Sequence, residues 1–155
     1  MCKDLHLGYV YSLSTVDKIK EIALEIGWDG EKTPRARKFL SDLKDLTSEF
    51  IDFPFQDIKK RISLIIDNVE RLGGNTDKIV IFIHSREPEE IERFKVELNA
   101  ETLLVRRPEV EDIVASNHAD ANYLEYEYDY IVPNYYGLEE LRCRAKEFLH
   151  ILKVI

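Results

Sequence analysis

The chain has 155 residues, of which 45% are hydrophobic and 10% aromatic, and this is enough apolar material for one sizeable core. Its 30 acidic and 22 basic residues give a formal net charge of -8, which repels a polyphosphate backbone, so no nucleic acid partner is expected. No signal peptide and no apolar run long enough to span a membrane is found, so we expect no membrane partner and a cytoplasmic location. Cys2 and Cys143 match neither a metal-ligand spacing nor a disulfide framework, which predicts reduced thiols.

The first predicted elements are a strand and two helices. Residues Leu7 to Leu13 have the composition of a strand, and the serine and threonine that follow are typical of a helix start. Apolar residues recur at helical spacing from Val16 to Ile26 and stop at Gly27, which predicts a helix C-terminus. A loop over 28–34 precedes a second amphipathic helix marked by apolar residues from Phe39 to Phe50.

The middle of the chain predicts alternating helices and strands. Pro54 interrupts the second helix, and a third helix is marked by apolar residues from Ile58 to Val69. The apolar run Ile79 to Ile83 is typical of a buried parallel strand. Pro88 at a first helical turn starts another helix, and Thr102 to Val105 predicts the next strand.

The last part of the chain predicts one more strand and one more helix. Residues 107–129 are polar and irregular, Tyr130 to Val132 is a short strand, and Leu138 to Leu152 is a terminal helix. We therefore expect one α/β domain over residues 1–155. Its core is expected to be a mostly parallel open sheet of about four strands with helices on both faces.

No phosphate-cradling loop is found. The commonest such loop, G-x-x-x-x-G-K-[ST], neutralises a triphosphate with backbone N–H groups and a lysine, and it is absent here. The nearest approach is Gly30-Glu31-Lys32-Thr33, but a glutamate separates the glycine from the lysine and the segment follows a helix rather than a strand. We therefore do not expect it to bind phosphate.

Two arginine clusters are candidate anion sites. The first lies where a loop meets a helix and comprises Lys32, Arg35, Arg37 and Lys38; a solvated helical face is the alternative interpretation. The second, Arg106-Arg107, follows a predicted strand, and the carboxyl end of a strand is where open α/β sheets bind ligands.

A further candidate pair follows the strand at Ile79 to Ile83. Arg86 and Glu90 could line the same crevice as Arg106-Arg107, or Arg86 could form a surface ion pair with a nearby glutamate, contributing about 0 to 1 kcal/mol. His118 lies near Asp120 without a second histidine at ligand spacing, so we expect no metal site.

Taken together, these segments resemble deoxynucleoside monophosphate kinases of the phage and bacterial type, which belong to the P-loop kinase superfamily. The resemblance extends from about Tyr9 to the C-terminus, in matching order and spacing. It is carried by Asp17-Lys18-Ile19-Lys20-Glu21, Gly27-Trp28-Asp29-Gly30, Arg35-Ala36-Arg37, Arg86-Glu87-Pro88-Glu89-Glu90, Arg106-Arg107-Pro108 and Ser116-Asn117-His118-Ala119-Asp120. It implies a lid-like segment at about 107–129. The substrate-binding residues that it implies are Asp17, Lys20, Trp28, Arg35, Arg37, Arg86, Glu90, Arg106, Arg107 and His118.

Two departures from the family change the expected activity. The family's first strand, phosphate loop and first helix have no counterpart before Leu5, and in the superfamily's strand order that strand separates those represented by Ile79 to Ile83 and Thr102 to Val105. Both strands would then lack a backbone partner. His84 also stands where the family often has an acidic residue close to magnesium, a role that imidazole cannot fill.

Three hypotheses follow. The leading one is a kinase-like protein that binds a deoxynucleoside monophosphate, has no cofactor of its own and does not catalyse transfer alone. The second is an N-terminally truncated form of a true kinase, which would use ATP and Mg²⁺. The third is a noncatalytic interaction domain that forms a homo-oligomer through exposed strand edges.

Overall fold

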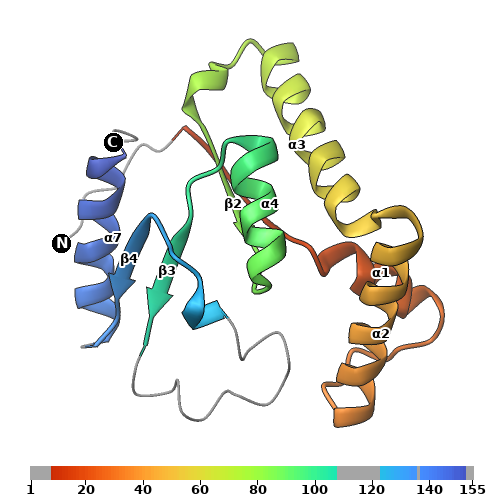
Figure 1. The fold of residues 1–155 in the computed structure, drawn as a ribbon. Coiled ribbons are helices and arrows are strands. Elements are labelled where there is room, and N and C mark those ends of the chain that lie inside the picture. Colours follow the sequence, from red (N-terminus) through yellow and green to blue (C-terminus); the bar gives the residue numbers. More distant parts are fainter. Residues whose placement is uncertain (1–7, 108–122, 136, 153–155) are drawn as a thin grey trace. The chain divides into compact units, whose positions relative to one another are not determined.

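The structure is a computed structural model that describes residues 8–107, 123–135 and 137–152 (Figure 1). The chain divides into two compact units, one formed by residues 8–84 and the other containing the described residues from Ser85 onward. We call them the first unit and the second unit and describe each by itself. No helix within the described residues is long and apolar enough to cross a membrane.

The first unit contains two parallel strands separated in sequence by three helices. Its elements are β1 (Tyr9–Ser14), α1 (Asp17–Glu25), α2 (Pro34–Ile51), α3 (Phe53–Arg71), the short 3₁₀ helix η1 (Thr76–Lys78) and β2 (Ile79–His84). β1 pairs with β2 along the whole of both strands, from Tyr9 opposite Ile79 to Ser14 opposite His84. Since side chains alternate between faces, Leu13 and Ser12 lie on opposite faces of this sheet.

The helices of the first unit end at or next to residues with a positive φ. Gly27 follows α1 with a φ of 105°, and the next N–H, of Trp28, donates to the Ala23 carbonyl at 2.8 Å, as in a Schellman motif. Gly73 ends α3 in the same way. Only Asp52 separates α2 from α3, and it adopts the left-handed conformation with a φ of 54°.

The core of the first unit joins β1 to α1 and α3. Its buried apolar side chains are Leu13 from β1, Ile19 and Ala23 from α1, and Phe55, Ile58 and Val69 from α3. Only a residue without a Cβ fits against this core at Gly74, because a Cβ there would lie 2.5 Å from the Tyr9 hydroxyl and 2.7 Å from a Val69 methyl carbon. The apolar spacing that predicted α1 and α3 thus reflects real burial.

The second unit contains the other pair of parallel strands. Its elements are α4 (Pro88–Leu98), β3 (Leu103–Arg106), the 3₁₀ helix η2 (Tyr123–Glu125), β4 (Tyr130–Pro133) and α7 (Leu138–Ile151). β3 pairs with β4 from Leu103 opposite Tyr130 to Arg106 opposite Pro133. The Tyr130 and Phe148 rings, from β4 and α7, meet edge to face with centroids 5.2 Å apart, so α7 packs on β4.

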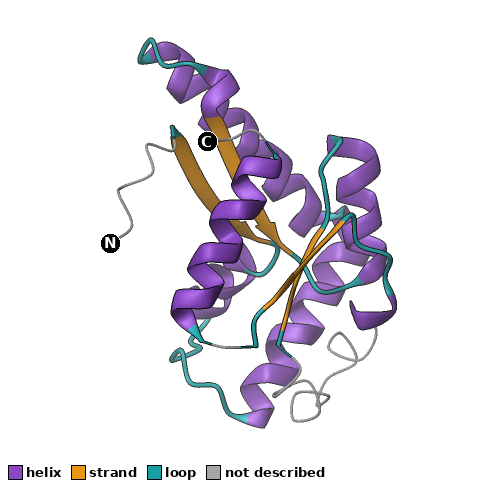
Figure 2. Ribbon diagram, turned by 90° about the vertical axis from the view of Figure 1, so that its left-hand side faces the viewer, coloured by secondary structure: helices purple, strands orange, loops and turns teal. Residues whose placement is uncertain are grey.

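The strand pairing differs from the sequence prediction in one respect. The fold is α/β with parallel strands, as predicted, but the described residues form two sheets of two strands each in place of a single sheet of about four (Figure 2). No ladder joins β2 to β3 within the part of the chain that the structure describes. Apolar composition indicates that a segment is a buried strand, but the choice of neighbour depends on long-range contacts that composition does not report.

Candidate functional site

The carboxyl end of the β1–β2 sheet carries a group of polar side chains. Ser12 Oγ and His84 Nε2 lie 2.8 Å apart, joining the two strands on one face of the sheet, and both residues are exposed. Carboxyl ends of parallel strands are where open α/β sheets bind ligands. This end of the first unit is therefore its candidate site.

Asp17 lies beside this candidate site but is held by protein groups. Its Oδ2 accepts hydrogen bonds from the Ser14 backbone N–H at 2.9 Å and from Arg61 Nη1 at 3.1 Å. The same Arg61 nitrogen lies 3.8 Å from an Asp57 carboxylate oxygen on α3. The resemblance implies substrate binding by Asp17, and the geometry gives its carboxylate a positioning role at the turn between β1 and α1. Sequence reasoning did not single out Arg61.

Lys20 and Trp28 occupy different surroundings in the same unit. Lys20 is exposed on α1. Trp28 is half-buried and its indole Nε1 donates to the Glu31 carbonyl at 2.9 Å, which folds the loop between α1 and α2 back on itself. Of the two side chains, that of Lys20 is the more exposed.

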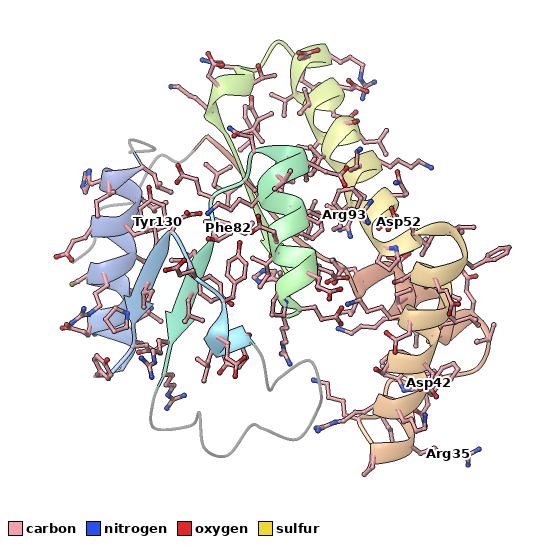
Figure 3. All side chains as sticks on the ribbon, viewed as in Figure 1. Arg35, Asp42, Asp52, Phe82, Arg93 and Tyr130 are labelled. Atoms are coloured by element: carbon pink, nitrogen blue, oxygen red, sulfur yellow. The ribbon has the colours of Figure 1, made fainter. Side chains whose placement is uncertain are left out.

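The first arginine cluster lies at the N-terminus of α2. Thr33 caps this helix by accepting a hydrogen bond from the Ala36 backbone N–H at 3.1 Å. Lys38 pairs with Asp42 at 2.7 Å, whereas Arg35 and Arg37 are exposed and have no recorded ion pair among the described residues. Figure 3 shows Arg35 projecting away from the start of α2. Two guanidinium groups are thus available to an anion where the helix dipole also favours negative charge.

The second unit holds the other predicted arginines. Ser85 Oγ donates to the Glu90 carboxylate at 2.7 Å, so Glu90 helps to fix the chain where it enters α4. Arg86 is exposed on the same connection. Arg106 and Arg107 are exposed at the carboxyl end of β3, where the Arg106 carbonyl accepts a hydrogen bond from the Asn134 N–H at 2.8 Å.

The predicted site residues are distributed over both units. Asp17, Lys20, Trp28, Arg35 and Arg37 belong to the first unit, and Arg86, Glu90, Arg106 and Arg107 to the second. His118 lies outside the described residues. Among the residues that the structure describes, no group of three His, Cys, Asp or Glu side chains could hold a metal ion.

The second unit also contains a polar network that sequence reasoning missed. Asp129 accepts hydrogen bonds from Lys95 Nζ at 2.5 Å, from the Thr102 N–H at 2.9 Å and from the Thr102 hydroxyl at 2.8 Å. Close by, the Tyr126 hydroxyl donates to the Glu92 carboxylate at 2.7 Å. The segment before β4 is thereby tied to α4 and to the start of β3.

This network shifts the pKa values of two of its members. The hydrogen bond from Lys95, and then those from Thr102, lower the pKa of Asp129 to about 2. Burial, and then the hydrogen bond to Glu92, raise the pKa of Tyr126 to about 12. Asp129 is therefore charged and Tyr126 neutral across the physiological pH range, so pH changes within that range leave the charges of this network unaltered.

The Asp129 network predicts a pH dependence of stability. Because the folded-state pKa of Asp129 is lowered, its contribution is present above the unfolded-state pKa and is lost as the pH falls from about 4 to about 2. Urea unfolding of Asp129→Asn and of the unchanged chain should therefore differ most above pH 4 and converge near pH 2. The control is Glu125→Gln, an exposed neighbour, which should follow the unchanged chain throughout. A difference that is independent of pH would contradict the assignment.

Comparisons with known proteins do not assign the chain to a family. No family model, no curated protein and no solved structure matches it.

Proposed function

We propose that this chain is a deoxynucleoside monophosphate kinase-like protein that binds a nucleoside monophosphate and does not transfer phosphate alone. The strand pairing carries the proposal. In the family that the sequence resembles, the phosphate-loop strand lies between the strands that correspond to β2 and β3. Each of the two ladders, β1–β2 and β3–β4, pairs strands that are neighbours in that order, and this supports the proposal.

Exposed arginines support the binding of a monophosphate. Arg35 and Arg37 are exposed at the start of α2 with no recorded ion pair among the described residues. Guanidinium groups bind phosphate oxygens through paired, charge-assisted hydrogen bonds, and backbone N–H groups at a helix start add donors. Arg106 and Arg107 offer a second exposed pair at the end of β3.

Two features argue against phosphoryl transfer by this chain alone. The sequence contains no G-x-x-x-x-G-K-[ST] loop to hold the triphosphate of ATP. His84 stands where the family often has an acidic residue, and it is hydrogen-bonded to Ser12. An imidazole supplies no hard oxygen ligand for Mg²⁺. If the chain forms part of a longer kinase, ATP and Mg²⁺ would be bound by groups supplied from elsewhere.

Calorimetric titration with each deoxynucleoside monophosphate and with ATP, beside a coupled assay for diphosphate formation, tests the proposal. The expected result is monophosphate binding without turnover. The matching deoxynucleoside, which lacks the phosphate, is the control and should bind at least about tenfold more weakly because it loses the arginine contacts. Turnover would overturn the argument from the missing loop. Absence of nucleotide binding together with a stable oligomer would favour a noncatalytic interaction domain.

A further inference from the structure

Strand β2 has the composition of a strand in the interior of a sheet. Its first five residues, Ile79-Val80-Ile81-Phe82-Ile83, are all apolar, so both of its faces carry apolar side chains. Such runs are typical of parallel strands that are covered on both faces. Its partner β1 differs, because Ser12 and Ser14 make one of its faces partly polar.

The pairing of β2 does not match this composition. Among the described residues it forms a ladder with β1 alone, so its other edge presents unpaired backbone N–H and C=O groups. None of the five apolar residues is fully buried, whereas Leu13 on β1 is only 4% exposed. β2 (Figure 1) also lacks the usual protection of an edge strand, since it contains neither proline nor lysine, and its register with β1 runs without a bulge.

We propose that the unpaired edge of β2 is an acceptor for an extended, uncharged strand of a partner chain. Unpaired main-chain groups spaced along a strand are satisfied by another strand, and this mode of recognition draws its affinity from main-chain hydrogen bonds. Apart from His84 at the end of β2, the side chains beside the incoming strand are aliphatic on one face and include Phe82 (Figure 3) on the other, and none of them is charged. A charged residue placed against them would be desolvated without a partner. The matching sequence is therefore rich in Val, Ile or aromatic residues.

The orientation follows from the existing sheet. β1 and β2 pair in parallel over six residues, and sheets that are purely parallel are favoured over mixed ones when strands are apolar on both faces. The partner strand should therefore run parallel to β2. The test of this proposal is separate from the test of nucleotide binding, because it measures the backbone edge of β2 and none of the arginines.

A pair of synthetic peptides tests the proposal on the full chain. The probe has alternating valines and isoleucines flanked by lysines for solubility, and the control has the same side chains with alternate backbone amides N-methylated. We expect the probe to bind and to slow hydrogen–deuterium exchange at residues 79–84. The N-methylated peptide should bind at least about tenfold more weakly, because it keeps the apolar side chains and loses the main-chain donors. Equal binding of both peptides, or failure of both to bind, would overturn the proposal.

A pair of variants locates the binding edge. Val80→Lys places a charge within β2 and should abolish probe binding. Leu72→Lys adds the same charge to an apolar residue that is 77% exposed beyond α3, and it should leave binding unchanged. If Val80→Lys does not fold, the comparison of the two peptides on the unchanged chain still tests the proposal. Protection of residues 79–84 that rises with protein concentration in the absence of peptide would identify a second copy as the occupant and would refute a separate partner.

Discussion

Replacing Arg37 by alanine should weaken deoxynucleoside monophosphate binding by roughly 10- to 100-fold and leave the free energy of unfolding unchanged. Hydrogen bonds to charged groups contribute about 1.5–3 kcal/mol, which corresponds to this loss of affinity. The Arg37 side chain is exposed and forms no ion pair with the described residues, so its removal should cost the fold no ion pair. Titration calorimetry gives the affinity, and urea unfolding gives the stability.

The matched control for Arg37→Ala is a substitution of the next residue, Lys38. Lys38 is also exposed on α2, but its ammonium group already pairs with Asp42 at 2.7 Å, so Lys38→Ala should change affinity much less. Arg106→Ala should weaken binding as well, since Arg106 lies where the resemblance implies a phosphate contact. Unchanged affinity in both Arg37→Ala and Arg106→Ala would refute the assignment of the site.

Ile58→Ala should lower the free energy of unfolding by about 2–5 kcal/mol, the range for removing a fully buried aliphatic side chain. Ile58 is 0% exposed on α3, in the core that joins α3 to β1 and α1. Leu64→Ala on the same helix is the control, because Leu64 is 49% exposed and should cost less than about 1 kcal/mol. Urea unfolding compares the two variants. Equal losses would show that α3 is not packed as the structure describes.

The elements of the fold could be predicted from local signals. Gly27 predicted a helix end because the left-handed conformation that it adopts is open to glycine at little cost. Pro88 predicted a helix start because proline lacks the N–H that a first turn leaves unpaired, and it lies in the first turn of α4. Pro54 predicted an interruption of the second helix, and it lies in the first turn of α3. These signals act over a few residues, so sequence alone reports them.

The long-range side-chain contacts could not be predicted in the same way. Arg61 reaches Asp17 across 44 positions of sequence, and Lys95 reaches Asp129 across 34. Each acid is one of 30 in the chain, and nothing in its neighbouring residues marks its partner. The arrangement in two sheets was not predicted for the same reason, because a ladder between strands is also a long-range contact. Sequence reasoning therefore located the ends of the strands and missed the side chains that brace them.

The sequence separation between paired strands also affects how the chain folds. The contact between Ser12 and His84 closes 72 positions of chain, whereas that between Thr102 and Asp129 closes 27. Closing the longer loop costs about 0.9 kcal/mol more in chain entropy, and contacts of long sequence separation slow folding. During synthesis, β1 leaves the ribosome before the three helices, and it cannot pair until β2 has also been synthesised. The first unit should therefore acquire its sheet later in its own synthesis than the second unit does, and α1, α2 and α3 form while β1 is still unpaired.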